Sequence, residues 1–288
     1  MRWLEEYALM TMPKQIVVAT DLSPASVAAV AVAGSIAQIF KAKTTLLHIF
    51  EYVPQHRYSI PVEWMVSNIR QDARTKLEEI KKSLGRSGIE VEVKMLEGGT
   101  PAQQIPAFLR TCESPLLLMG THAVGGMDRF LLGSTAEQVL RQVECPVITV
   151  GPHVLAGEEN HAGLQKILFA TDFSETSPAA IPLLLELKKA SGAQLRVLHV
   201  SGNHISGTEE NQQFAPVQKA LQDAEGVEYV TLHGTNIGQA VTNEAERYPA
   251  DLVVLGVRRA PEAAAHLAPK LAFQIIAAAP CAVLTVSC

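Results

Sequence analysis

The sequence predicts an α/β protein built from two tandem doubly wound domains, each with a five-stranded parallel sheet. Two observations lead to this prediction. Four apolar segments of the 288-residue chain occur twice and in the same order. Within the first copy, short β-branched runs alternate with longer helix-like segments, which is typical of parallel strands covered by helices on both faces.

The repeat is visible both in the residues and in their spacing. The paired segments are IVVATDLSPAS and ILFATDFSETS, TLLHIFE and RVLHVSG, LLLMGTHA and LVVLGVRR, and CPVITV and CAVLTV. Asp21 lies 27 residues before His48, and Asp172 lies 27 residues before His199. Because chance would not readily reproduce both residues and spacing, we interpret the chain as two copies of one unit.

The boundary between the copies falls in a stretch with the composition of a linker. Residues 150–163 read VGPHVLAGEENHAG, which is rich in glycine and polar residues. We therefore expect one domain at residues 11–152 and a second at residues 163–288.

The elements of the first copy follow from its apolar runs and the segments between them. The predicted strands are Gln15–Thr20, Thr44–Phe50, Glu90–Leu96, Leu116–Met119 and Pro146–Val150. The predicted helices are Ser26–Phe40, Val62–Leu84, Gln103–Thr111 and Ser134–Val143. The third of these helices has the weakest pattern, because Pro106 within it removes a backbone hydrogen bond.

The helix predicted at Val62–Leu84 has an apolar stripe at helical spacing, and we expect this stripe to face the core. Its members are Trp64, Met65, Ile69, Leu77, Ile80 and Leu84.

Composition excludes several classes of protein. Hydrophobic residues make up 48% and charged residues 18%, which favours a folded globular chain. The net charge of -5 gives no basic face for nucleic acid. The longest apolar stretch, 27–40, is too short to cross a bilayer, so we expect no membrane partner. Four cysteines without a CxxC pair suit a reducing compartment, and we expect a cytoplasmic protein.

Open parallel sheets bind ligands beyond the carboxyl ends of their strands. The ends that carry polar or small residues are Ala19-Thr20-Asp21 and Met119-Gly120-Thr121-His122. A glycine-rich loop follows Gly120, and Ser134 and Thr135 then open a helix. Glycines allow close approach of a phosphate, and a helix N-terminus attracts an anion. A flexible loop with an ordinary helix cap is the alternative that composition leaves open.

These segments resemble universal stress proteins of the tandem two-domain type. That family has a Gly-x2-Gly-x9-Gly-[Ser/Thr] loop that binds ATP, and Gly120 and Gly133-Ser134 take its first and last places. The resemblance implies an adenine nucleotide alpha hydrolase-like fold. It also implies ATP or a related adenine nucleotide as ligand, with Mg²⁺ as an accompanying ion. The last strands of the two copies would pair antiparallel and form an intramolecular pseudo-dimer.

The resemblance also implies which residues bind the nucleotide. They are Ala19, Thr20, Asp21, Ile49, Met119, Gly120, His122, Ala123, Gly133, Ser134 and Thr135. Ala123 departs from the family, which has its second glycine there; the added methyl is tolerated at negative φ and unfavourable at positive φ.

The second copy departs further from the family loop. Arg259, Pro269 and Lys270 take the places of Ala123, Gly133 and Ser134. Proline has no N–H to donate to a phosphate. We therefore expect that the second copy does not bind ATP in the family manner, although Lys270 offers a point charge to an anion.

Several residues allow two interpretations. Asp21 is suited either to binding a ribose or adenine group or to capping the following helix. His122 lies in the loop, where a lone histidine is more often a spectator than a ligand. His48 and His199 recur at matched strand positions, so we expect a structural role for both.

The leading hypothesis is an ATP-binding universal stress protein that acts in the stress response without robust catalysis. A nucleotide-independent scaffold that binds a protein partner is the second. A slow ATPase or phosphotransferase ranks last, because no general base is evident near the loop. A homodimer of two pseudo-dimers is a further assembly that the family suggests.

Overall fold

The structure is a computed structural model, which describes residues 12–51, 62–121, 132–151, 154, 163–174, 176–202, 207–221, 224–257 and 270–287. The loop residues 122–131 and 258–269 lie outside these ranges, and with them the predicted positions His122, Ala123, Arg259 and Pro269.

The first copy has all nine predicted elements. Its strands are β1 (Gln15–Ala19), β2 (Lys43–Phe50), β3 (Val91–Glu97), β4 (Pro115–Gly120) and β5 (Val147–Val150). Its helices are α2 (Pro24–Phe40), α3 (Val62–Arg86), α4 (Pro101–Leu109) and α5 (Ser134–Gln142). The helix predicted around Pro106 is confirmed, because α4 continues through this buried residue.

The second copy repeats the order of the first. Its strands are β6 (Lys166–Thr171), β7 (Gln194–Ser201), β8 (Val227–His233), β9 (Leu252–Val257) and β10 (Ala282–Ser287). A short 3-10 helix (Ser177–Ala180) leads into α6 (Ile181–Ser191), and α7 (Gly207–Ala220), α8 (Ile237–Arg247) and α9 (Lys270–Ala278) follow.

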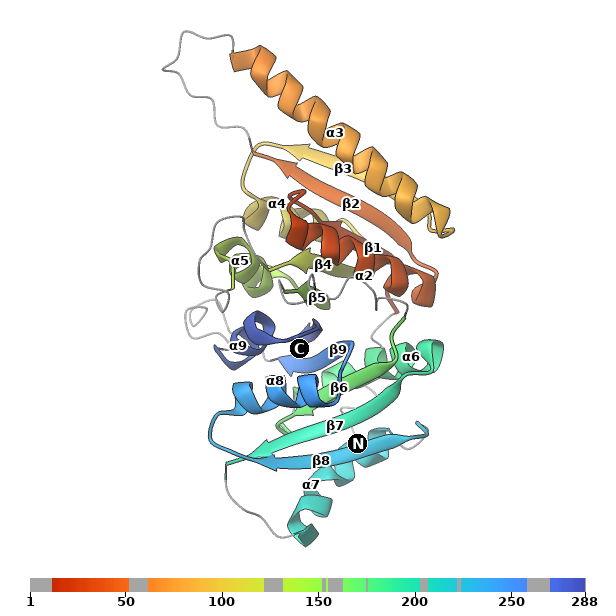
Figure 1. The fold of residues 1–288 in the computed structure, drawn as a ribbon, viewed down its shortest axis with the longest axis vertical. Coiled ribbons are helices and arrows are strands. Elements are labelled where there is room, and N and C mark those ends of the chain that lie inside the picture. The colour runs from red at the N-terminus through yellow and green to blue at the C-terminus, as the bar shows by residue number, and fades with distance from the viewer. Residues whose placement is uncertain are drawn as a thin grey trace.

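The described strands form one ten-stranded sheet along the long axis of the molecule (Figure 1), in the order β3-β2-β1-β4-β5-β10-β9-β6-β7-β8. Strands within each copy pair in parallel. At the centre, β5 and β10 pair antiparallel, with Leu284 opposite Ile148. The predicted pseudo-dimer is therefore confirmed, and the two parallel sheets are halves of one sheet.

Alternate strand residues face opposite sides of this sheet, as the pleat requires. Ile16 and Val18 belong to a core cluster under α2, α3, α6 and α7, which extends across both copies. Val17 and Ala19 belong to a separate cluster under α4 and α5. A third cluster lies under α8 and α9.

The apolar stripe of α3 faces the core only in its C-terminal half. Leu77 and Leu84 are buried, whereas Trp64, Met65 and Ile69 are 72%, 57% and 48% exposed. The expectation of a continuous core face is wrong for the first turns. The reason is length: 25 helical residues span about 37 Å, and the seven residues of neighbouring β3 span about 23 Å.

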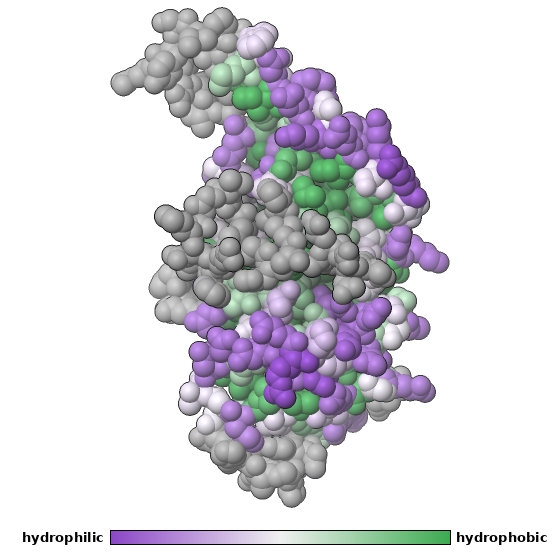
Figure 2. All heavy atoms as spheres, in the orientation of Figure 1, coloured by the Kyte–Doolittle hydropathy of each residue, from purple (hydrophilic) through white to green (hydrophobic). Residues whose placement is uncertain are grey.

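The position of α3 agrees with the distribution of hydrophilic and hydrophobic side chains on the surface. Figure 1 places the helix at the outer edge of the sheet, beside β3. Figure 2 shows mainly hydrophilic side chains along it and hydrophobic side chains toward the middle of the molecule. Among the described residues, no helix has the length and the apolar character that a membrane span requires.

Candidate functional site

The turn after β1 holds Asp21 at the carboxyl edge of the sheet. The Ser23 N–H donates to Asp21 Oδ1 at 2.9 Å, and Ser26 N–H donates to Ser23 Oγ at 3.3 Å, so Ser23 caps α2. Leu22 between them has a φ of 64°, a conformation unfavourable for a residue with a side chain. The helix cap is therefore Ser23, and Asp21 holds the turn before it through Oδ1, while the ligand-binding interpretation of Asp21 stays a prediction.

The ionisation of Asp21 follows from the same contacts. Burial disfavours the charged form, but hydrogen bonds from Ser23 and Ser26 outweigh it, and the pKa of Asp21 is lowered. Asp21 is therefore a carboxylate at neutral pH. It can accept hydrogen bonds from ligand hydroxyl or amino groups, and it repels phosphate.

His48 fastens β2 to the end of β1. Its Nδ1 lies 2.8 Å from the Thr20 carbonyl oxygen, and because a carbonyl only accepts, Nδ1 carries the proton. In the second copy His199 makes the same bond to Thr171 at 3.0 Å. The predicted structural role is confirmed for both histidines.

The start of α5 differs from that of α2 because its cap has no side chain. Gly133 is the N-cap, with φ -61° and ψ 143° and no side-chain hydrogen bond to the first turn. Its own N–H donates to the Thr121 carbonyl at 2.9 Å. The next three N–H groups, from Ser134 onward, have no acceptor within the helix, as at any helix start. Such groups and the helix dipole favour an anion.

A cavity of about 670 Å³ joins these two ends of the sheet. Nine of the predicted site residues line it: Ala19, Thr20, Asp21, Ile49, Met119, Gly120, Gly133, Ser134 and Thr135. His122 and Ala123 lie outside the described residues. The cavity lies at the carboxyl ends of β1 and β4, where the strand order reverses, as expected for an open parallel sheet.

Residues of α3 form a further wall that the sequence analysis missed. Ile69, Asp72, Ala73 and Lys76 line the cavity from one face of this helix. Of these four, only Ile69 belongs to the predicted apolar stripe, and their spacing of three and four residues places them on one side of the helix. Glu51, directly after β2, also lines the cavity. This wall therefore adds two carboxylates and one ammonium group to the site.

The described residues do not form a metal site of their own. No group of three or more His, Cys, Asp and Glu side chains in the described ranges is arranged to hold a metal ion. The expected Mg²⁺ thus finds no support in this part of the chain.

The second copy has a smaller cavity at the matching edge of its sheet. Its volume is about 370 Å³, and Asp172 and Gly256 line it as Asp21 and Gly120 line the first. Asp172 Oδ1 accepts from Ser174 N–H at 2.9 Å and from Ser177 Oγ at 2.7 Å. Phe173 repeats the positive φ of Leu22, at 58°.

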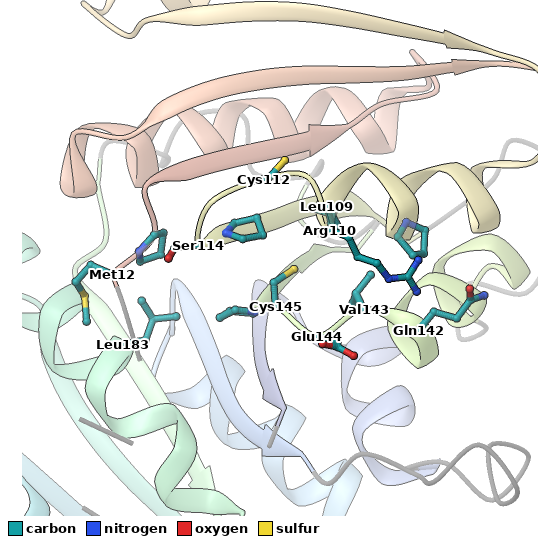
Figure 3. Close-up of a pocket in the computed structure, with 14 residues that line it drawn as sticks. Met12, Leu109, Arg110, Cys112, Ser114, Gln142, Val143, Glu144, Cys145 and Leu183 are labelled. Carbon is teal, nitrogen blue, oxygen red and sulfur yellow. The ribbon is translucent and has the colours of Figure 1, made fainter. Parts of the chain in front are cut away.

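A cavity of about 360 Å³ lies at the opposite edge of the sheet, near the amino ends of β1, β4 and β5. Figure 3 shows the polar ends of Arg110, Gln142 and Glu144 on one side of it and Met12 and Leu183 on the other. It contains none of the predicted site residues.

Comparisons with known proteins identify the family. A model of the universal stress protein family matches residues 12–151 and, separately, residues 163–287. A universal stress protein of Methanocaldococcus jannaschii is 32% identical over 139 residues, which cover 48% of this chain and 81% of that protein. A universal stress protein of Thermus aquaticus is 28% identical over 142 residues, which cover 48% of this chain and 98% of that one.

Solved structures agree on the fold. A universal stress protein of Archaeoglobus fulgidus has a TM-score of 0.78 at 19% identity, covering 96% of this chain and 99% of that chain. A protein of Pseudomonas aeruginosa described as a putative universal stress protein has a TM-score of 0.66 at 16% identity, covering 96% and 94%. Since the family matches both halves and the fold agrees along the chain, this protein belongs to the universal stress protein family as a tandem two-domain member.

Proposed function

We propose that the first domain binds ATP or a related adenine nucleotide and that the protein acts in the stress response as a nucleotide-dependent binding protein. One observation supports this most strongly. The N-terminus of α5, whose N-cap Gly133 makes no side-chain hydrogen bond, lines the same 670 Å³ cavity as the carboxylate of Asp21. The cavity thus combines an anion-binding end with a hydrogen-bond acceptor, within the size range of small-molecule sites.

The phosphates are assigned to the α5 end of the cavity. Gly133 has negative φ, which any residue can adopt, so chain conformation does not explain a glycine there. Close approach of a phosphate explains this glycine, because a side chain at position 133 would project near the free N–H groups. Ser134 and Thr135 add hydroxyl donors to this end.

The adenosine is assigned to the β1 end of the cavity. Ala19 and Ile49 supply apolar walls, and the ionised Asp21 accepts from a ribose hydroxyl or an adenine amino group. A magnesium ion would accompany the phosphates, since it is commonly bound through phosphates and few protein ligands.

Binding without turnover can still act as a signal. A ligand shifts a protein toward the conformation that it binds best, and it can thereby change the affinity for a protein partner. We also propose that this occurs in the cytoplasm, because the free thiols of Cys112 and Cys281 suit a reducing compartment. The domain limits at residues 11–152 and 163–288 and a homodimer of pseudo-dimers belong to the same proposal.

Isothermal titration of ATP into the full chain tests the function. A Gly133→Asp variant provides a sharp comparison, because Asp is a favoured N-cap and should preserve α5. Its carboxylate would occupy and repel the phosphate end, and we expect at least a tenfold loss of ATP affinity. The Gly133→Asn variant is the matched control, with the same shape and no charge, and should lose less.

Two results would contradict the proposal. Saturating ATP that gives neither heat nor competition with a labelled nucleotide excludes nucleotide binding. Unchanged ATP affinity in Gly133→Asp shows that the phosphates do not lie at the start of α5.

A further inference from the structure

The cavity of the second copy matches the first position by position at one end. Ala170, Asp172 and Val200 line it at the places that Ala19, Asp21 and Ile49 occupy in the first cavity. Ile237 and Val241 of α8 likewise take the places of Pro101 and Ile105 of α4. The part of the site that we assign to adenosine is therefore present in both copies.

The other end of the second cavity has changed in chemistry. Leu271, which is 39% exposed, lines it where the first copy has the Thr135 hydroxyl. The buried Ala272 and Ile275 continue this apolar wall. The residues before Leu271 are Pro269, which has no N–H, and Lys270, which replaces the Ser134 hydroxyl with a point charge.

Backbone packing limits the second cavity where β9 ends. A Cβ added to Gly256 would lie 2.5 Å from the Thr176 carbonyl oxygen and 2.7 Å from Ser177 Cα. The backbone at the start of the 3-10 helix thus packs directly against the end of β9. The cavity of about 370 Å³ is correspondingly about half the volume of the first, at 670 Å³.

One acceptor is available for a ligand in this cavity. Asp172 Oδ1 accepts from the Ser174 N–H and from Ser177 Oγ, and the Ser174 hydroxyl also hydrogen-bonds this carboxylate. Asp172 Oδ2 can accept from a hydroxyl or amino group. Among the described side chains that line the cavity, Asp172 is the single charged one, and its sign opposes a phosphate.

We propose that the second cavity is a binding site for an uncharged nucleoside and that it discriminates against the same molecule carrying a phosphate. The apolar walls from α8 and α9 would bury the base, and Asp172 would accept from a hydroxyl or amino group. The assignment of the adenosine end rests on the function proposed for the first domain. The two copies would then respond to different chemical forms of one class of ligand.

Adenosine and AMP are the probes, because they differ only in the phosphate. Isoleucine and valine methyl groups of the full chain are labelled, and each probe is titrated by NMR. Ile275 and Val241 report on the second cavity, and Ile49 and Ile105 report on the first. From the reporters of the second cavity, we expect a Kd for adenosine at least tenfold lower than that for AMP. From the reporters of the first cavity, we expect AMP to bind at least as tightly as adenosine.

An Ile237→Asp variant tests the site without disrupting the fold. Ile237 is the first residue of α8 and 39% exposed, so a carboxylate there suits the helix dipole. It also puts a charge at the apolar wall, and we expect at least a fivefold loss of adenosine affinity. Asn243→Asp adds the same charge to the exposed side of α8 and should leave the affinity unchanged.

The outcomes for the two cavities are separate. If Ile275 and Val241 do not respond to adenosine, or respond equally to AMP, the second site is wrong while the first stands on its own reporters. If neither probe nor ATP shifts the methyl signals of Ile49 and Ile105, the proposed function of the first domain is wrong.

Discussion

Asp172 Oδ1 accepts two hydrogen bonds, from Ser174 N–H and Ser177 Oγ, and so holds the chain that leads into the 3-10 helix. Burial disfavours the carboxylate, but these bonds outweigh it, and the pKa of Asp172 is lowered. An Asp with a depressed pKa in the folded state stabilises the fold above its unfolded pKa. That contribution is lost as the pH falls through the folded pKa.

An Asp172→Ala variant should therefore lose stability in a pH-dependent way. At pH 7 we expect the free energy of unfolding to fall by about 1 kcal/mol, as for loss of a helix cap. The difference from the parent should shrink below about pH 4, where the unfolded carboxylate protonates. Urea unfolding at pH 7 and at pH 3.5 measures both values. Asp172→Asn keeps an acceptor and should lose less at pH 7; an equal loss for Asp172→Ala at both pH values would contradict the assignment.

At the scale of elements, the alternation of apolar runs was sufficient to locate every strand of the first copy. Each predicted strand end lies within one residue of the observed one. Strands buried on both faces are nearly continuous apolar runs, whereas β3 alternates apolar and charged residues. The α3 wall of the site was not predictable in this way. The same helical spacing describes a core stripe and a cavity wall, and only the length of α3 relative to β3 separates Ile69 from Leu77.

The apolar pattern also does not predict contacts between segments that are distant in the sequence. Arg196 on β7 contacts Glu228 on β8 at 2.8 Å and Glu244 on α8. Its guanidinium also lies 4.0 Å from the ring centre of Tyr248. Glu244 is only 5% exposed, so Arg196 neutralises a buried charge and fastens α8 to the sheet.

An Arg196→Met variant should destabilise the second domain strongly. Methionine fills similar space but leaves Glu244 buried, with Arg247 at 3.6 Å as its remaining ion-pair partner in the described chain. We expect the free energy of unfolding to fall by about 3 kcal/mol, as when one partner of a buried ion pair is removed. Urea denaturation measures the loss. The double variant Arg196→Met with Glu244→Gln also removes the buried negative charge and should recover part of the lost free energy of unfolding. No recovery would mean that lost packing alone explains the effect of Arg196→Met.

At the scale of the whole molecule, the two domains share both a sheet and a core. Thr149 Oγ1 donates to the Val283 carbonyl at 3.2 Å, and Thr285 Oγ1 donates to the Val147 carbonyl at 3.3 Å, so side chains reinforce the β5–β10 pairing from both strands. The core under α2 and α6 continues across this junction. On the other face each copy has its own cluster, and Leu132 and Leu140 of the first copy pack against both clusters.

A shared sheet and core predict that ATP bound in the first domain stabilises the second. If the chain unfolds as one cooperative unit, ligand at 100 times its Kd adds about 2.7 kcal/mol to the stability of the whole. Hydrogen exchange in moderate urea measures this in peptides that cover 43–50 of β2 and 194–201 of β7. We expect ATP to slow exchange in both peptides by the same free energy.

The junction itself provides the control for this coupling. A Thr285→Pro substitution places a proline, which has no N–H, in a central strand opposite Val147, and should weaken the β5–β10 pairing. The ATP effect should then persist in β2 and diminish in β7. Protection confined to β2 in the parent chain would show that the domains unfold independently despite their common sheet. Equal protection in the parent and loss of the β7 effect in Thr285→Pro would instead identify the β5–β10 pair as the route by which nucleotide in one domain reaches the other.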